Sequence, residues 1–92
     1  MKIQIQCFAQ LAQAAGTPES TLDLPQDATA KDALRAFAQD TTRAARTLLF
    51  NEDGELQPTI LLFLDSEPIL WSEPAPAHEG STLFVATPIA GG

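Results

Sequence analysis

The chain has 92 residues, of which 45% are hydrophobic and 18% charged, and this balance predicts one folded globular domain. Its net charge of −7 disfavours nucleic acid as a partner, and its longest apolar run, residues 60–64, is far too short to span a membrane. The single cysteine, Cys7, excludes an internal disulfide, and the first residues lack the layout of a signal peptide, so we expect a cytoplasmic protein.

Two strands and a short helix are predicted in the first quarter of the chain. Residues 1–8 alternate between apolar and polar side chains, which is typical of a half-buried strand. Residues 9–15 indicate a short helix that ends at Gly16. Residues 20–24 then predict a second strand, closed by Pro25.

The clearest helix follows Thr29. This residue is a suitable N-cap, and Asp32 three positions later completes an approximate capping box. A shorter helix is expected over residues 41–48, and residues 51–54 form a strong turn signal. An apolar stripe at helical spacing marks the buried side of the first of these helices: Ala30, Ala33, Leu34, Phe37 and Ala38.

The last part of the chain predicts two more strands. They cover residues 59–65 and 82–87, and residues 68–80, which contain three prolines, are expected to form a loop between them. The resulting order is strand, strand, helix, strand, strand. It predicts an α+β domain in which a mixed sheet packs on one main helix. A β-grasp topology, with the first and last strands parallel at the sheet centre, fits this order.

The period of two in the strands divides their side chains between two faces. One set faces the helix and forms the core: Ile3, Ile5, Cys7, Leu22, Leu24, Ile60, Leu62, Leu64, Leu83 and Val85. The opposite face carries aromatic and aliphatic residues: Phe8, Leu61, Phe63, Phe84 and Ala86. One helix leaves this second face uncovered, so we expect a partner to dock there, unless residues 68–80 or 41–50 fold over it.

The charge is divided unevenly along the chain. Residues 1–46 hold five basic and five acidic residues, whereas residues 47–92 hold seven acidic residues and no lysine or arginine. The second half therefore suits a basic surface on a partner protein, although an acidic surface that only confers solubility is the simpler alternative.

No cluster of side chains predicts an active site or a metal site within the chain. His78 is the only histidine and is expected on the surface of a loop, and Cys7 is expected to be a small buried residue. Glu52, Asp53 and Glu55 lack the spacing of a calcium-binding loop and indicate a solvated turn. Trp71 fits either loop packing or a contact with a partner.

The sequence closes on Gly91 and Gly92, which have no side chains to pack. The simple explanation is a frayed end. The alternative is a flexible tail over residues 89–92, attached to a domain over residues 1–88, that delivers the carboxylate of Gly92 into a narrow slot of another protein. Extended, these four residues reach roughly 13 Å at ~3.3 Å per residue.

Three segments together resemble a known family, the ubiquitin-like sulfur carriers, represented by the small subunit of molybdopterin synthase and the sulfur carrier of the thiamine pathway. They are FAQLAQAAG at 8–16, LFNEDGELQP at 49–58, and GSTLFVATPIAGG at 80–92. The resemblance spans essentially the whole chain, and the tail is its most specific part. It implies a β-grasp fold and a carrier rather than an enzyme.

The resemblance also implies a defined chemistry. An E1-like enzyme would use ATP and Mg²⁺ to adenylate Gly92, and a desulfurase or rhodanese-type sulfur donor would convert the adenylate into a thiocarboxylate. A large catalytic subunit or another client enzyme would receive the sulfur, most simply for molybdopterin. The chain itself would bind no cofactor and would contribute only positioning. Gly91 and Gly92 would enter the slot, and these residues would contact partners: Phe8, Leu61, Phe63, Phe84, Ala86, Pro88, Ile89 and Ala90.

The sequence departs from the family pattern at several positions. Ser81-Thr82 replaces an acidic pair, Ala86 replaces an aromatic residue, Ala12-Gln13 replaces arginine-glutamate, and Asp65-Ser66 replaces an asparagine-glycine turn. Three functions therefore stay open: a sulfur carrier for molybdopterin, thiamine or another metabolite, a ubiquitin-like modifier joined through Gly92 to target lysines, and an interaction domain with an incidental tail.

Overall fold

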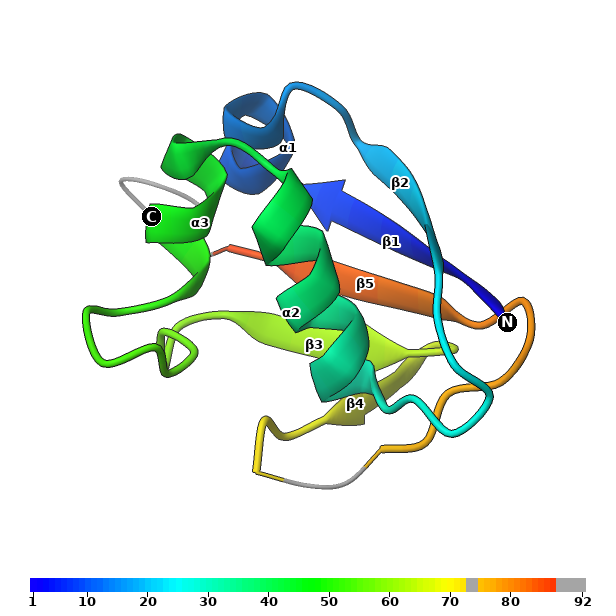
Figure 1. The fold of residues 1–92 in the computed structure, drawn as a ribbon. Coiled ribbons are helices and arrows are strands. Elements are labelled where there is room, and N and C mark those ends of the chain that lie inside the picture. The colour runs from blue at the N-terminus through cyan, green and yellow to red at the C-terminus, as the bar shows by residue number, and fades with distance from the viewer. Residues whose placement is uncertain (73–74, 88–92) are drawn as a thin grey trace.

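The computed structural model describes residues 1–72 and 75–87, and within them it shows a five-stranded sheet with three helices (Figure 1). The strands lie in the order β2-β1-β5-β3-β4. The elements in chain order are β1 (Lys2–Phe8), α1 (Gln10–Ala15), β2 (Glu19–Asp23), α2 (Ala30–Asp40), α3 (Arg43–Leu49), β3 (Leu61–Leu64), β4 (Glu67–Ile69) and β5 (Thr82–Ala86).

The centre of the sheet is the pair formed by β1 and β5, which run parallel with Ile5 opposite Leu83. The other pairings, β1 with β2, β3 with β5 and β3 with β4, are antiparallel. This arrangement is the β-grasp topology, so the predicted α+β fold with parallel first and last strands is confirmed.

The helices begin where the sequence supplies caps. Thr29 and Asp32 form a complete capping box at the start of α2, because each side chain accepts a hydrogen bond from the other residue's backbone N–H. The next helix, α3, begins at Arg43, two residues later than expected, because the Thr42 side chain accepts from the Ala45 N–H. None of the helices in the described part of the chain is long and apolar enough to cross a membrane.

The loop prediction for residues 68–80 is wrong at its beginning, where β4 pairs with β3 and forms an edge of the sheet. The connection is a two-residue turn at Asp65 and Ser66, whose φ angles of 51° and 75° are those of a type I′ turn. Pro68 fits within β4 because a proline, which lacks an N–H donor, is tolerated on an edge strand. The hairpin formed by β3 and β4 carries no strong turn signal in the sequence, because neither of its two turn residues is glycine.

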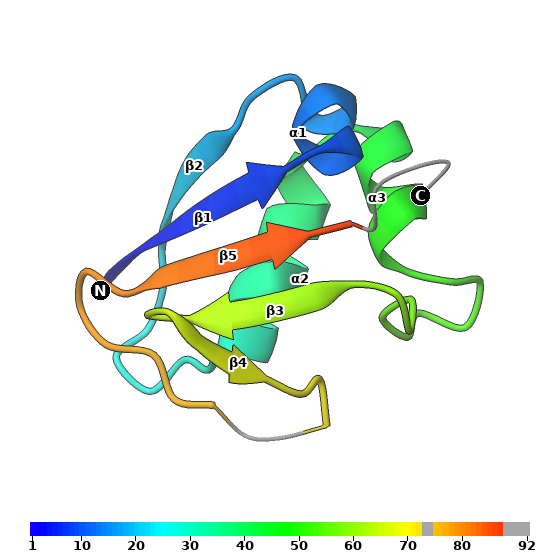
Figure 2. The same ribbon diagram turned by 180° about the vertical axis from the view of Figure 1, so that it is seen from behind.

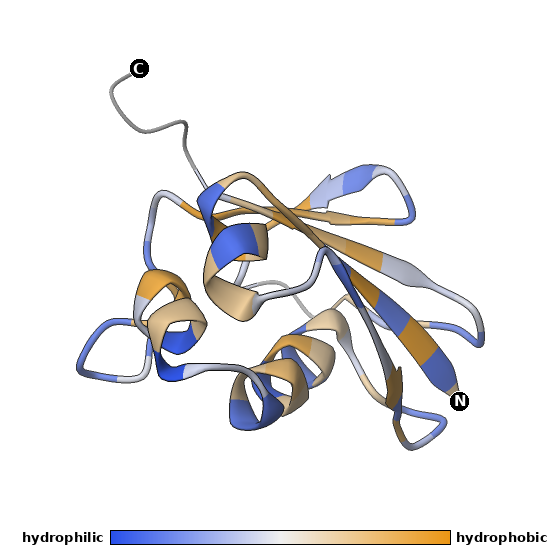
Figure 3. Ribbon diagram, turned by 90° about the horizontal axis from the view of Figure 1, so that it is seen from above, coloured by the Kyte–Doolittle hydropathy of each residue, from blue (hydrophilic) through white to orange (hydrophobic). Residues whose placement is uncertain are grey.

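The core lies between the sheet and the helices. Along β1 the hydropathy alternates from residue to residue, as the strand starting at the N mark in Figure 3 shows. The inward residues of the three central strands are almost fully buried, and Leu22, Leu24 and Leu64 pack at the edge of the cluster. Five residues of α2 cover this layer, as the apolar stripe predicted: Ala30, Ala33, Leu34, Phe37 and Ala38.

Candidate functional site

The sheet face opposite the helices carries a row of aromatic side chains. Phe84 on β5 lies opposite Phe63 on β3 and opposite Gln6 on β1. The rings of Phe8 and Phe84 are stacked, with centroids 5.8 Å apart and planes 15° from parallel. Because the rings cover one another only partly, the row remains open to contact from outside.

Aliphatic residues extend this row toward the end of the sheet. Ala86 lies between Phe8 on one side and Leu61 on the other. Phe8 is 45% exposed and Leu61 is 56% exposed, both high values for large apolar side chains. We call the set of Phe8, Leu61, Phe63, Phe84 and Ala86 the aromatic face. None of the three helices, α1, α2 and α3, crosses it, as the view from behind shows (Figure 2).

Trp71, in the loop after β4, packs toward the helices rather than on the aromatic face. Its ring meets Phe50 edge-on at 5.7 Å, and the Lys31 ammonium and the Arg35 guanidinium of α2 lie 4.8 and 5.5 Å from its centroid. Its indole N–H donates to the Glu55 carboxylate at 3.3 Å. Trp71 therefore has the packing role that the sequence left open.

The described chain ends at Thr87, just beyond the aromatic face. The predicted tail residues Pro88, Ile89, Ala90, Gly91 and Gly92 lie outside the described residues, so their roles and the boundary at residue 88 stay predictions. The structure does establish that β5 delivers the chain to the end of the sheet where Phe8, Leu61 and Ala86 lie together.

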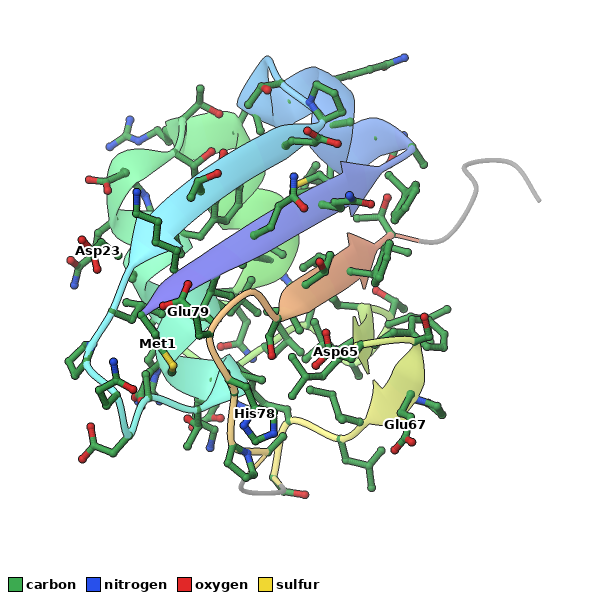
Figure 4. All side chains as sticks on the ribbon, turned by 90° about the vertical axis from the view of Figure 1, so that its right-hand side faces the viewer. Met1, Asp23, Asp65, Glu67, His78 and Glu79 are labelled. Carbon is green, nitrogen blue, oxygen red and sulfur yellow. The ribbon has the colours of Figure 1, made fainter. Side chains whose placement is uncertain are left out.

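Cys7 and His78, the other residues considered for chemistry, lie outside the aromatic face. Cys7 is buried under the helices, and burial raises the pKa of its thiol from 9.0 to about 11, which keeps the thiol neutral and unreactive. His78 is exposed in a loop (Figure 4). No group of histidine, cysteine and carboxylate side chains that could hold a metal ion occurs within residues 1–72 and 75–87.

The acidic turn after α3 is held by hydrogen bonds to the side chain of Asn51. The Asn51 side-chain oxygen accepts hydrogen bonds from the N–H groups of Asp53 and Glu55 at 2.9 and 3.1 Å, and Phe50 forms a bridge with Leu56. The predicted turn is therefore confirmed as a short hairpin.

One structural group was missed by sequence reasoning. The carboxylate of Asp65 accepts a hydrogen bond from the buried Ser81 hydroxyl at 2.9 Å and another from the Thr82 N–H at 3.0 Å. Asp65-Ser66 and Ser81-Thr82, noted separately as departures from the family pattern, are thus joined in one network that ties the β3–β4 turn to the start of β5. Figure 4 shows Asp65 near the start of β5. Only the paired occurrence of the two departures hinted at the link.

Comparison with known proteins identifies the family, although no family model matches the chain. The chain is 34% identical over 85 residues to small archaeal modifier protein 1 of Haloferax volcanii, covering 92% of this chain and 94% of that protein. The chain belongs to the ubiquitin-like sulfur carriers and modifiers.

Solved structures of such ubiquitin-like proteins extend the comparison. The crystal structure of small archaeal modifier protein 1 from Haloferax volcanii superposes with a TM-score of 0.90 at 30% identity over the whole of both chains. A putative molybdopterin converting factor subunit 1 from Pyrococcus furiosus gives 0.73 at 20% identity, covering 97% of this chain and 99% of that one. The BexX/CysO complex of Amycolatopsis orientalis gives 0.68 at 18% identity, covering 98% and 99%. These last two show that the fold is shared.

Proposed function

We propose that this ubiquitin-like carrier works through the carboxylate of Gly92. An E1-like enzyme adenylates this carboxylate with ATP and Mg²⁺, releasing pyrophosphate, and a sulfur donor then displaces AMP to leave a thiocarboxylate. The observation that supports the proposal is the position of β5, which brings the chain to the rim of the aromatic face directly before the Gly-Gly tail. Members of this family are generally not catalytic themselves.

The chemistry needs an activated acyl group, because a free carboxylate is a poor acceptor for a nucleophile. Adenylation supplies a good leaving group, and the enzyme must supply the catalytic side chains. The carrier contributes orientation, because holding the reacting atoms in the correct geometry lowers the activation free energy of the reaction. The aromatic face would fix the body on the enzyme, and the acidic second half would complement a basic surface.

Glycine is required at the end of the tail because the adenylation slot has to be narrow enough to exclude water and side chains. We expect Gly91→Val, or an extension beyond Gly92, to abolish pyrophosphate exchange by the cognate activating enzyme while the unfolding transition is unchanged. Undiminished exchange by the extended protein would contradict the proposal. Gly80→Ala is not a suitable control, since Gly80 has a φ of 83°, whereas Ser72→Val changes an exposed loop position only.

Sulfur donation, with molybdopterin synthesis as the first destination, is the leading use of the activated tail. The structural likeness to a putative molybdopterin converting factor subunit accords with it, but at 20% identity that likeness concerns the fold. Protein modification is the second candidate, and the name of the 34% identical relative favours it.

Mass spectrometry of the protein from its native host separates these uses. Replacement of one carboxylate oxygen by sulfur on Gly92 supports the carrier. Gly-Gly remnants on lysines of other proteins support the modifier. If neither mark is found and deletion of Gly92 has no phenotype in the native host, the protein is an interaction domain whose tail is incidental.

A further inference from the structure

The helical side of the molecule contains a second surface with a different character. A hollow of about 660 Å³ lies between α2, α3 and the short hairpin of residues 50–56. The hollow is open to solvent rather than enclosed. The helices that form it make up the layer in front of the sheet in Figure 1 and behind the sheet in Figure 2. The hollow therefore lies on the opposite side of the sheet from the aromatic face.

All three arginines of the chain line this hollow: Arg35 from α2, and Arg43 and Arg46 from α3. Two of them are held in place. Arg46 donates from Nη1 to the backbone oxygen of Ala38 at 2.9 Å, and the Arg35 guanidinium lies over Trp71. A fixed guanidinium loses less conformational freedom when it binds an anion, so the hollow is organised before any ligand arrives.

These arginines form no ion pair with a carboxylate of the described residues. Across residues 1–72 and 75–87, the only ion pair joins the N-terminus to Asp23, so no carboxylate in that part of the chain neutralises a guanidinium of the hollow. This is unusual for a chain with 12 acidic and five basic residues, where an arginine has many carboxylates available. Three of the five basic residues thus line one hollow, without an ion pair among the described residues.

The remaining lining distinguishes between possible anions. Phe50 is half-buried and Ala38 is buried, so the hollow offers apolar surface next to the guanidinium groups. Glu52 also lines the hollow, and its neighbour Asp53 is exposed. An extended peptide can place carboxylates on the arginines and an apolar side chain on Phe50, whereas an inorganic polyphosphate has no apolar group that could use this surface.

We infer that this arginine-lined hollow is a docking groove for an acidic segment of a partner protein that also carries an aromatic or aliphatic residue. Arginine forks bind carboxylates with two parallel hydrogen bonds, which gives such a groove both affinity and orientation. Because the groove lies on the helical side, a protein bound there leaves the aromatic face free. The chain can therefore bind two proteins at once, and this inference does not depend on the chemistry of Gly92.

Fluorescence polarisation with a labelled peptide tests the groove. The probe is fluorescein-Ser-Asp-Glu-Phe-Asp-Glu-Leu-Gly, and the matched peptide replaces each Asp by Asn and each Glu by Gln. We expect the acidic peptide to bind with a Kd of about 10–100 µM, to lose at least about tenfold in affinity when Arg35→Gln and Arg43→Gln are combined, and to weaken with added salt. Lys2→Gln is the matched control, because it removes an exposed positive charge outside the groove and should change the Kd less than about twofold.

Several results would overturn the inference. They are equal binding of the uncharged peptide, unchanged binding by the double arginine variant, or no binding up to about 1 mM peptide. Sodium tripolyphosphate that binds more tightly than the peptide, and loses affinity in the double variant, would make the hollow a phosphate site instead. A folded Phe84→Asp variant must still bind the acidic peptide, and a loss there would move the binding site to the aromatic face.

Discussion

The two broad surfaces of this small domain are built for different contacts. The aromatic face is formed by three neighbouring strands, exposes large apolar side chains and borders the start of the tail. The arginine-lined hollow is formed by two helices and a hairpin, and it places three arginines beside apolar surface. The sheet cannot serve both purposes, because its inner side is fully used by the core. The layered fold thus places an apolar recognition surface on one side of the sheet and a surface that combines arginines with apolar groups on the other.

The largest loss of stability is expected in the core between the sheet and the helices, because both surfaces are built on it. Leu83 lies fully buried on the inner side of β5, so Leu83→Ala should lower the free energy of unfolding by about 3 kcal/mol through lost burial and an unfilled cavity. Leu61→Ala changes the same residue type on the exposed side and should cost less than about 1 kcal/mol. Urea unfolding measures both. Equal losses would mean that Leu61 is covered in solution and that the aromatic face is not open.

A charge on the aromatic face should affect activation and leave the fold in place. Phe84→Asp places a carboxylate in the middle of the row and should reduce pyrophosphate exchange by about 30-fold, the equivalent of about 2 kcal/mol for a central interface residue. Gln4→Asp adds the same charge toward the other end of the same face and serves as the control. If both variants exchange at the wild-type rate, the enzyme does not dock on this face.

The buried thiol gives a pH-dependent test of the core under the helices. The pKa of Cys7 is raised by burial to about 11 in the folded protein, so the folded state holds its proton more tightly than the unfolded state does. Stability from this group is therefore complete below pH 9 and is lost as the pH rises toward 11, by about 1 kcal/mol at pH 10. Cys7→Val removes this titration, so the wild type should lose more stability than the variant between pH 8 and pH 10. Parallel curves would show that the thiol is hydrated.

A small gain is expected at the corner where the chain leaves the aromatic face for α1. Ala9 has a φ of 56° and a ψ of −133°, a conformation that glycine adopts readily and alanine does not. Ala9→Gly should therefore raise the free energy of unfolding by about 0.5–1 kcal/mol. Ala12→Gly, inside α1, should lower it by a similar amount. A destabilised Ala9→Gly variant would show that this backbone conformation is not retained in solution.

Much of the fold could be predicted because each local signal agrees with the next. The alternation in residues 1–8, the Thr29–Asp32 capping box and the apolar stripe of α2 all specify one buried layer, and the β-grasp order follows from them. The edge strand β4 was not predicted because its turn uses Asp65 and Ser66 rather than a pair that contains glycine. The turn is also held by hydrogen bonds from Ser81 and Thr82 to Asp65, sixteen and seventeen residues away, which no local pattern reveals.

The candidate surfaces were predictable to different degrees. The aromatic face follows from a period of two, which fixes the side of every strand residue once one side is buried. The arginine-lined hollow could not be predicted, because Arg35 lies on one helix and Arg43 and Arg46 on another, and only the packing angle of α2 and α3 brings them to the same place.

The central position of β5 also has a mechanical consequence. It is hydrogen-bonded along one side to β1 and along the other to β3, and it is followed directly by the tail. A force applied to the tail runs along β5 and loads both ladders in shear, so that their hydrogen bonds must break together rather than one at a time. An edge strand such as β4 would instead peel away bond by bond. The domain should therefore withstand pulling from its tail, as when an ATP-driven unfolding machine engages it, better than its small core suggests.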